Sequence, residues 1–261
     1  MKRIINTFLF LSLAFSTAFA QVGRIMYLDF NTADANEIKS LIGEKTKKFN
    51  NTLEGEKIYT FQVAAGEKNG QLVRFLYADS FGQIEAYPKK GNEWWWKNVS
   101  PKITNSSGTE FLQYAEDASH NIAKPGENKV WKVLFYKIKP GEGESFWRYR
   151  KNVAKAAAEL GDEISLRVWS SSIGGIPGRV LVTYAHKDYT GLDNESESWP
   201  KVVKKYNEMF NGNYNADNVA FSKSLEMWGN YSELWRFLPE LSSPVPSSQT
   251  PFIVKKNPFN F

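Results

Sequence analysis

The feature that most constrains this chain is an order of secondary-structure elements that occurs twice, once in each half. In the second half, apolar Ile164, Leu166 and Val168 alternate with polar residues, which predicts a strand. Val202 and Tyr206 follow helical spacing. The expected elements are a strand at 132–139, a helix at 145–160, a hairpin at 164–169 and 180–185, a helix at 199–210 and a last strand at 221–228. The predicted order is β-α-β-β-α-β.

The first half repeats this order with slight sequence identity. Its expected elements are a strand at 24–30, a helix at 34–49, a hairpin at 58–63 and 72–78, the start of a second helix at 94–99 and a last strand at 111–116. Tyr77 aligns with Tyr184 at an offset of 107 positions, and Trp94 and Trp199 each begin a second helix. The halves match in element order rather than in residues.

Local signals refine some of these boundaries. Asp34 followed by Glu37 is typical of a capping box, and Ser145 is a candidate N-cap for the helix after the first strand of the second half. The polar stretch Asp188–Ser198 predicts a loop. Its alternate carboxylates suggest calcium, but the turn glycine and distant bidentate glutamate of a calcium loop are missing, which favours a solvated surface.

A β-α-β-β-α-β unit is the ferredoxin-like arrangement, in which both helices cover one face of an antiparallel sheet. The strands carry apolar residues on both sides, as at Ile58 and Tyr59, so the other face also needs cover. Two tandem units whose bare sheets shield each other meet this need. The predicted fold is α+β, with two tandem ferredoxin-like units forming an intrachain pseudo-dimeric α/β barrel.

The chain divides into four predicted regions. Residues 1–20 read as a signal peptide, with a basic start, an apolar run and a small-residue exit at Ala18-Phe19-Ala20, so we expect an exported protein, periplasmic or secreted. Residues 21–124 and 129–241 are the two repeats. Residues 242–261 form an extended, low-complexity C-terminal tail.

Composition excludes several classes of protein. The chain has no cysteine, which excludes disulfides, thiolate metal sites and a cysteine nucleophile. Without residues 1–20, which hold two basic and no acidic residues, the net charge falls from +5 to +3, too little to argue for nucleic acid. No further apolar run is long enough to span a membrane. We expect a monomer or weak homodimer, because each half serves as the other's partner.

The element order, together with the closing run Ser232–Leu241, resembles the dimeric α/β-barrel superfamily, with its antibiotic-biosynthesis-monooxygenase-like, NIPSNAP-like and stress-responsive barrel domains. The resemblance covers about residues 24–238 and rests on no catalytic motif. It implies a pocket between each sheet and its helices or inside the barrel. Family members carry out oxygenation, dechlorination or haem breakdown, or have no known catalytic activity, so the resemblance selects no chemistry.

Few residues suggest catalysis. His120 and His186, the only histidines, each follow a predicted strand; they are weak candidates for a proton shuttle or haem ligand, and a position at a loop edge is the simpler interpretation. Two histidines alone would leave a haem or zinc ion under-ligated, so no metal or other cofactor is expected. The serines at 170–172 lack a nucleophile-elbow motif, and no phosphate-binding loop is present.

The unusual feature is the aromatic content, which includes nine tryptophans. Three of them are consecutive, at 94–96, and therefore cannot all face one core from a helix. Tryptophans beside polar groups often line sites for flat or apolar ligands, although they also fill cores. The candidate ligand-binding residues are Trp95, Tyr114, Trp169, Tyr184 and Trp228, with His186 close by.

Three functions remain open. The leading hypothesis is an exported, non-catalytic protein that binds a small apolar or aromatic molecule in an aromatic-lined cavity, because no catalytic constellation is evident. The alternative is a cofactor-independent oxygenase-like enzyme of the same superfamily, with His186 or His120 moving protons. A third hypothesis is a protein-interaction module built around an exposed aromatic patch at 94–96.

Overall fold

The computed structural model describes residues 21–51, 55–120, 127–161 and 164–244. The predicted signal peptide and the tail beyond residue 244 lie outside these residues. The first half contains β1 (Val22–Asp29), α1 (Ala35–Lys45), β2 (Lys57–Ala65), β3 (Leu72–Ala78), α2 (Phe81–Ala86), α3 (Lys90–Asn98), β4 (Asn105–Ser106) and β5 (Glu110–Tyr114). The second half contains β6 (Val130–Lys137), α4 (Gly143–Ala158), β7 (Leu166–Ile173), β8 (Arg179–His186), α5 (Thr190–Asp193), α6 (Glu195–Met209), α7 (Tyr214–Lys223) and β9 (Tyr231–Phe237).

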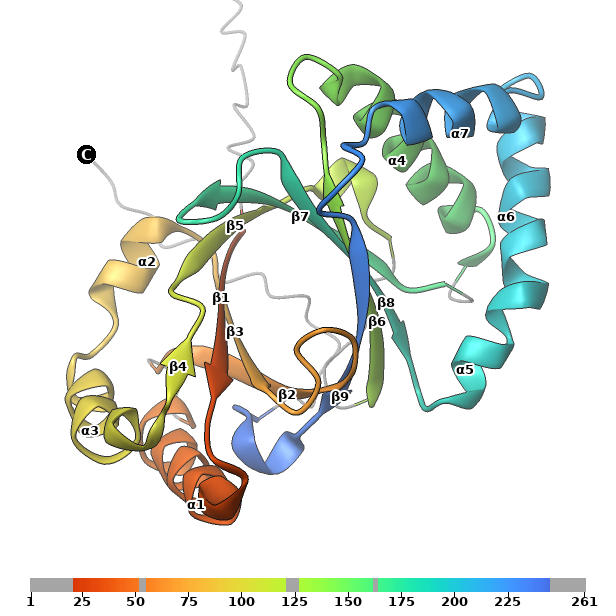
Figure 1. Ribbon diagram of the computed structural model, residues 1–261. Coiled ribbons are helices and arrows are strands. Elements are labelled where there is room, and N and C mark those ends of the chain that lie inside the picture. The colour runs from red at the N-terminus through yellow and green to blue at the C-terminus, as the bar shows by residue number, and fades with distance from the viewer. Residues whose placement is uncertain (1–20, 52–54, 121–126, 162–163, 245–261) are drawn as a thin grey trace, which may run out of the picture.

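Eight strands of the described chain close into an antiparallel β-barrel, which Figure 1 shows end-on. In the first half the strand order is β5-β1-β3-β2, and in the second half it is β9-β6-β8-β7. Two pairings, β2 with β9 and β5 with β7, join the halves at both edges. The molecule is therefore an α+β protein in which the two halves have the same strand order and share one closed sheet.

The inward face of the barrel is aromatic. Along β9 the alternate residues Tyr231, Trp235 and Phe237 contribute to the interior, as the two-residue period of a strand requires. Phe61 lies 5.6 Å from Trp131 and 5.5 Å from Trp235 between ring centroids, so rings from both halves pack together. This shared interior holds the halves together through apolar burial.

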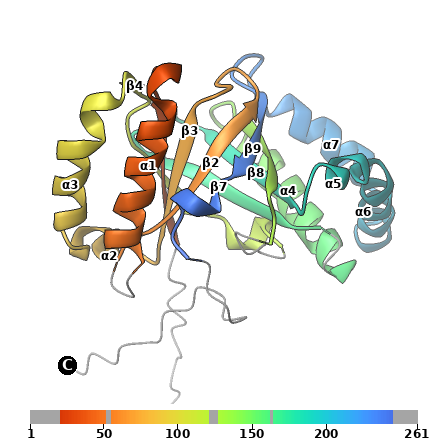
Figure 2. The ribbon, with the colours of Figure 1, turned by 90° about the horizontal axis from the view of Figure 1, so that it is seen from below.

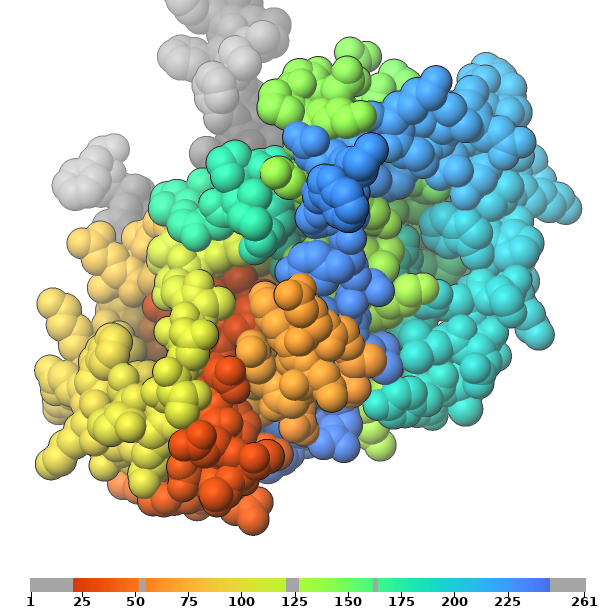
Figure 3. Space-filling view, viewed as in Figure 1, coloured from red at the N-terminus to blue at the C-terminus, as the bar shows by residue number. Residues whose placement is uncertain are grey.

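One end of the barrel is covered by the turn between β2 and β3. In the space-filling view this orange hairpin lies across the end that faces the reader (Figure 3). The amine of Lys68 lies 3.5 Å from the centre of the Tyr27 ring. Beneath it, the buried carboxylate of Glu233 accepts hydrogen bonds from the Tyr27 hydroxyl at 2.8 Å and the Trp235 indole N–H at 2.7 Å. One carboxylate oxygen of Glu233 thus accepts both hydrogen bonds, while the other has no partner among the described residues.

The outward face of the sheet is covered by helices on two opposite sides, as Figure 2 shows. Helices α1 and α3 lie over the first half, where Ile38 and Ile42 are fully buried beside Leu28 and Leu72. Helices α4, α6 and α7 lie over the second half. Each half therefore encloses a space between its sheet and its helices, separate from the barrel interior.

The predicted last strand of the second half is wrong. Residues 214–223 form helix α7, and the strand that closes the barrel is β9, which begins at Tyr231, after the predicted strand has ended. Phe221 belongs to that helix because its ring packs under α4, 4.6 Å from the Tyr149 ring and 5.3 Å from the Phe146 ring. Gly229, with φ of +92°, provides the turn that precedes the real strand.

Several predicted helix boundaries also change. The stretch expected to be a loop at Asp188–Ser198 contains α5 and the first turn of α6. Helix α4 begins at Gly143, two residues before the expected cap at Ser145. Asp34 does precede α1, but its backbone is already helical and its side chain makes no capping hydrogen bond, so no capping box forms. Trp94 and Trp199 lie inside their helices, not at the start.

The alignment of Tyr77 with Tyr184 is wrong as well. Tyr77 packs into the barrel interior, whereas Tyr184 packs outside it against the helices of the second half. An error of one residue in register moves a whole strand to the opposite face. An offset of 107 therefore superposes inward positions on outward ones.

Candidate functional site

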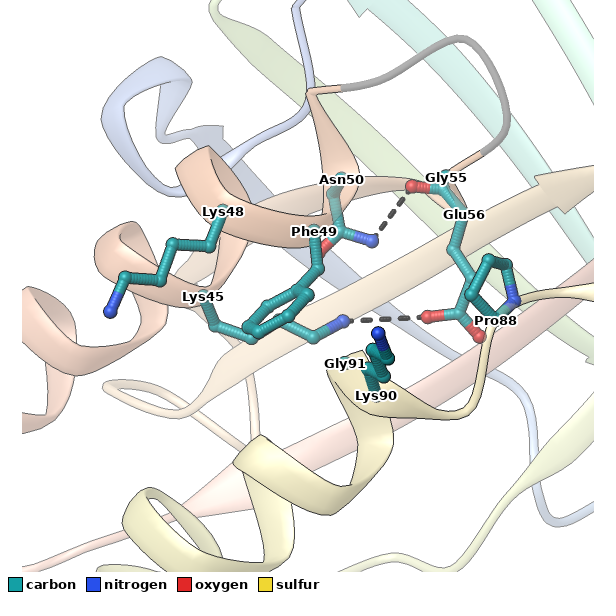
Figure 4. Close-up of a pocket in the computed structure, with 9 residues that line it drawn as sticks. All are labelled: Lys45, Lys48, Phe49, Asn50, Gly55, Glu56, Pro88, Lys90 and Gly91. Carbon is teal, nitrogen blue, oxygen red and sulfur yellow. Dashed lines mark hydrogen bonds and ion pairs between the residues drawn. The ribbon is translucent and has the colours of Figure 1, made fainter.

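A cavity of about 150 Å³ lies outside the barrel, in the space between the sheet and the helices of the first half. Figure 4 shows it where the end of α1, the start of β2 and the start of α3 meet. Its lining residues are Lys45, Lys48, Phe49, Asn50, Gly55, Glu56, Pro88, Lys90 and Gly91. The volume suits one small ring or a small ion, since an apolar cavity of about this size can hold a benzene molecule.

The apolar wall of the cavity depends on a close approach of two helical segments. After α1 the chain continues as a π-helical turn, Thr46–Asn50, which carries Phe49. A side chain at Gly91 would place its Cβ 3.1 Å from the Cβ of Phe49, so glycine lets α3 approach this ring. Phe49 and Pro88 then line the cavity together.

The polar wall is fixed by hydrogen bonds from three distant segments. The Asn50 side-chain amide donates to the Glu56 carbonyl oxygen at 2.8 Å. The Ser243 hydroxyl donates to the same oxygen at 3.4 Å, and the Thr46 hydroxyl donates to the Leu241 carbonyl oxygen at 3.1 Å. The end of the second half thus braces a site that lies in the first half.

The main ionic contact of the cavity joins Lys45 to Glu56. Their side chains are 3% and 8% exposed, and the Lys45 Nζ lies 3.4 Å from a Glu56 carboxylate oxygen. Arg24 approaches the other carboxylate oxygen at 3.5 Å. Both contacts are longer than the 2.7–2.9 Å of a tight charge-assisted bond. Glu56 is therefore shared by two cations and held closely by neither.

Burial, and after it the positive charge of Arg74, lower the pKa of Lys45 to about 8. The carboxylate of Glu56 opposes this shift without cancelling it. A lysine with this pKa has an appreciable neutral fraction near physiological pH, so its amine can accept a proton. This makes Lys45 the strongest candidate for acid–base chemistry in the cavity.

Arg74 lies on the outward face of β3, beside these groups. Its guanidinium carbon lies 4.9 Å from the centre of the Trp95 ring. The residue is 4% exposed, and neither terminal nitrogen has a hydrogen-bond partner among the described residues. Burial lowers the pKa of Arg74 to about 10, so it stays charged at neutral pH.

The five predicted ligand-binding residues do not share one cavity. Tyr114 and Trp169 meet inside the barrel, with ring centroids 5.1 Å apart. Tyr184 packs beneath the helices of the second half, and Trp95 packs beneath those of the first. Trp228 is 80% exposed because its segment is not the strand that was expected. Helical spacing predicted that the three consecutive tryptophans could not all face one core, and Trp96 is the one that is exposed.

Both histidines bond to other protein groups. His120 Nε2 is 2.8 Å from the Gly161 carbonyl oxygen, and His186 Nε2 is 3.0 Å from a carboxylate oxygen of Glu195. Neither lines the described cavity, and within the described ranges no three His, Asp or Glu side chains gather as a metal site. These residues do not fit a haem or a metal ion, so no step is assigned to either.

Sequence reasoning missed the charged residues of the site, although two signals pointed to them. Lys45 occupies the apolar stripe of α1, between Ile42 and Phe49. Arg74 stands in the apolar run of β3. A cation among buried positions marks a charge that the fold must accommodate.

Comparison with known proteins finds similarity of fold alone. No protein-family model matches the chain, and no curated protein matches its sequence. A solved structure provisionally named a monooxygenase, from Lactobacillus acidophilus NCFM, is 10% identical with a TM-score of 0.60 and covers 87% of this chain and 99% of its own. An anthrone oxidase-like protein is 8% identical with a TM-score of 0.55, covering 90% and 97%. A chlorite dismutase mutant from Candidatus Nitrospira defluvii is 8% identical with a TM-score of 0.52, covering 84% and 92%.

These neighbours contradict the leading prediction of a non-catalytic ligand-binding protein, because the structures that share the fold bear the names of enzymes. In the described part of the chain, no helix has the length and apolar character needed to cross a bilayer. The chain shares its closed-barrel fold with these solved structures.

Proposed function

We propose that this protein is an enzyme that oxygenates a small single-ring quinol with dioxygen, without a metal or organic cofactor, in the cavity of the first half. The observation that carries the proposal is Lys45, a buried amine with a pKa of about 8 that lines a ring-sized cavity. The fold neighbours named as a monooxygenase and an anthrone oxidase-like protein support the same class of reaction.

The chemistry begins with removal of a proton from the substrate hydroxyl. The neutral Lys45 amine accepts this proton, and the resulting quinolate is electron-rich enough to reduce dioxygen directly. One oxygen atom forms a new bond to a ring carbon and the other leaves as water, so that a quinol and dioxygen give a hydroxyquinone and water. The quinol supplies all four electrons, and no external reductant is needed.

The neighbouring charges favour this step. After proton transfer, the Lys45 ammonium lies beside Glu56, and Arg24 and Arg74 add positive charge in the same space. A buried positive environment stabilises the quinolate and the reduced oxygen that follows, because electrostatic interactions strengthen where water is excluded. Phe49 and Pro88 supply the apolar wall for the ring.

The test is oxygen uptake with single-ring quinols, comparing the wild type with Lys45→Met. General-base catalysis contributes about 10²–10⁴-fold, so we expect at least a 100-fold loss in kcat. Lys47→Met is the matched control, since this neighbouring lysine is exposed and does not line the cavity. Equal oxygen uptake by wild type and Lys45→Met would refute the role of Lys45.

We also propose that the two halves are tandem copies of one ferredoxin-like unit. The common strand order and the two edge pairings support this. When residues 21–124 and 129–261 are produced together as separate chains, a duplicated unit should assemble through β2–β9 and β5–β7. Failure to recover a complex of the two chains would argue against independent units.

A further inference from the structure

Lys45 differs from the other two lysines that line the cavity. Lys48 and Lys90 are exposed, and Lys48 forms an ion pair with Glu44 at 2.6 Å. The Lys45 side chain is 3% exposed, and Figure 4 shows its amine directed along the cavity toward the carboxylate of Glu56. A ligand in the cavity therefore lies beside Lys45, whereas bulk water has little access to it.

The protonation state of Lys45 decides what its amine can do to such a ligand. A lysine attacks a carbonyl carbon only when it is neutral, and burial or a neighbouring cation increases the neutral fraction. Here burial, and after it the positive charge of Arg74, lower the pKa of Lys45 to about 8. At pH 7 about one amine in ten is then neutral, against about one in 2,500 for a lysine of ordinary pKa.

We infer that Lys45 forms a Schiff base with a small aromatic aldehyde that enters this cavity. Phe49 and Pro88 supply an apolar wall, and the volume of about 150 Å³ suits one ring. An aldehyde fits better than a ketone, because its carbonyl carbon carries only one substituent. This activity shares the cavity and Lys45 with the proposed oxygenation but does not rest on it, since it needs neither a quinol nor dioxygen.

The reaction needs only groups that the cavity provides, together with one proton from solvent. The Lys45 nitrogen bonds to the carbonyl carbon, and the π electrons of the carbonyl move to its oxygen. The Glu56 carboxylate, 3.4 Å from the amine, accepts a proton from the nitrogen and returns it to this oxygen. The solvent proton then lets the oxygen leave as water. One amine, one aldehyde and one proton thus give one water and one protonated imine, whose positive charge again faces Glu56.

The experiment is incubation of the full chain at pH 7 with benzaldehyde and sodium cyanoborohydride, which reduces the imine to a stable benzylamine. Peptide mass spectrometry then locates the modified lysines. We expect Lys45 to be modified at least about tenfold faster than Lys48, the exposed lysine of the same cavity, because only a neutral amine attacks. This comparison is made within one chain and therefore does not depend on a variant that folds.

Two variants complete this measurement. Lys45→Met should lose the fast modification and keep the slow modification of exposed lysines, and its thermal unfolding checks that it is folded. Lys47→Met is the matched control, because Lys47 is exposed and does not line the cavity, and it should leave the rate at Lys45 unchanged.

The pH dependence tests the mechanism. With Nα-acetyl-lysine in the same mixtures as the reference amine, the relative rate at Lys45 should reach half of its maximum near pH 8. The Glu56 carboxylate raises the pKa of Lys45, so Glu56→Gln should move this midpoint to lower pH. The maximum rate should also fall, because the proton relay is lost. An unchanged midpoint and rate in Glu56→Gln would overturn the role of Glu56.

The outcomes separate this inference from the proposed function. An adduct at Lys45 without oxygen uptake on any quinol upholds the Schiff base and refutes the oxygenase. Oxygen uptake that depends on Lys45, with no adduct at Lys45 or with equal rates at Lys45 and Lys48, upholds the oxygenase and overturns the Schiff base. Propanal that modifies Lys45 as fast as benzaldehyde, each relative to Nα-acetyl-lysine, would overturn the assignment of an aromatic aldehyde.

Discussion

Each half has a space between its sheet and its helices. The strand order is the same in both halves, but different side chains occupy the two spaces. In the second half, α4 packs against α6 and α7, and the rings of Phe146, Tyr149, Tyr206 and Phe221 fill the space. In the first half, α1 and α3 are shorter, and the space holds a cavity, a lysine, a glutamate and an arginine. Aromatic packing dominates the space of the second half, whereas the described cavity lies in the space of the first half.

Each space buries an arginine, and their surroundings sharpen the contrast. Arg150, on α4, is 2% exposed and donates a hydrogen bond to the Tyr184 hydroxyl at 3.2 Å. Burial alone would lower the pKa of Arg150, but the phenols of Tyr184, Tyr136 and Tyr149 together outweigh burial and raise it. Arg74 has no such hydroxyl partner in the described residues. The buried arginine of the second half thus has one internal acceptor, at Nη2, while its Nε has none, whereas both terminal nitrogens of Arg74 lack an acceptor among the described residues.

The largest effect is expected where both halves depend on one residue. Trp169 is buried in the barrel interior and contacts Phe75 and Tyr77 of the first half, at 5.2 and 5.6 Å between ring centroids. Trp169→Ala should lower the free energy of unfolding by about 3–5 kcal/mol, the usual cost of removing a buried tryptophan. Denaturant unfolding followed by far-UV and near-UV signals measures this. If one half unfolds separately from the other, the barrel is not a shared core.

The next effect concerns the cavity of the first half alone. Because the neutral form of Lys45 is the proton acceptor and its pKa is about 8, turnover should rise with pH and level off above pH 8. Between pH 8 and pH 6 we expect kcat/KM to fall about 50-fold, because about half of Lys45 is neutral at pH 8 and about one hundredth at pH 6. The rate of Lys45→Met, measured in parallel, corrects for uncatalysed quinol oxidation. A flat profile over this range would remove Lys45 as the base.

A smaller effect is expected in the filled space of the second half. The Tyr206 hydroxyl donates to Asp217 at 2.6 Å and accepts from the Asn152 amide at 3.2 Å. Tyr206→Phe should lower the free energy of unfolding by about 1–3 kcal/mol, because both partners lose a hydrogen bond. Turnover should stay unchanged, as measured by oxygen uptake. A loss of turnover beyond that explained by unfolding would mean that the second space takes part in catalysis.

The smallest effect is expected at the surface of the first half. Trp96 is 68% exposed, whereas Trp95 contacts the Arg74 guanidinium. Trp96→Ala should change the free energy of unfolding by no more than about 0.5 kcal/mol, as measured by denaturant unfolding. Trp95→Phe, which keeps a smaller ring, should lower the free energy of unfolding by more, because its indole packs against a buried guanidinium. Equal free energies of unfolding for the two variants would show that the contact between Trp95 and Arg74 adds nothing to stability.

Much of the fold could be predicted, because local patterns decide hairpins and amphipathic helices. The strand expected at 72–78 has the same limits as β3, and Gly161 ends the helix region of α4 with φ of +69°. The errors lie where tertiary contacts outweigh the local pattern. Residues 221–228 look like a strand, but Phe221 is buried more effectively beneath α4.

The site could be predicted only in part. Trp95 was a candidate ligand-binding residue because of its aromatic ring. In the structure its ring contacts the guanidinium of Arg74, and the residues next to Trp95 in the sequence do not indicate this contact. Lys45, Glu56 and Arg74 are far apart in the chain and match no motif. Their significance comes from burial and from the imbalance of charge, and both are properties of the assembled fold.

The sequence alone was enough to predict most strands and helices of the two halves, because side-chain alternation and helical spacing are patterns of residues close together in the chain. They could not tell which face of each strand turns inward, because both faces are apolar and a shift of one residue exchanges them. Closure of the barrel settled that choice for Tyr77 and Tyr184. Barrel closure also placed three cations, Lys45, Arg24 and Arg74, near the carboxylate of Glu56. Only long-range packing determines which charged groups are buried beside one another.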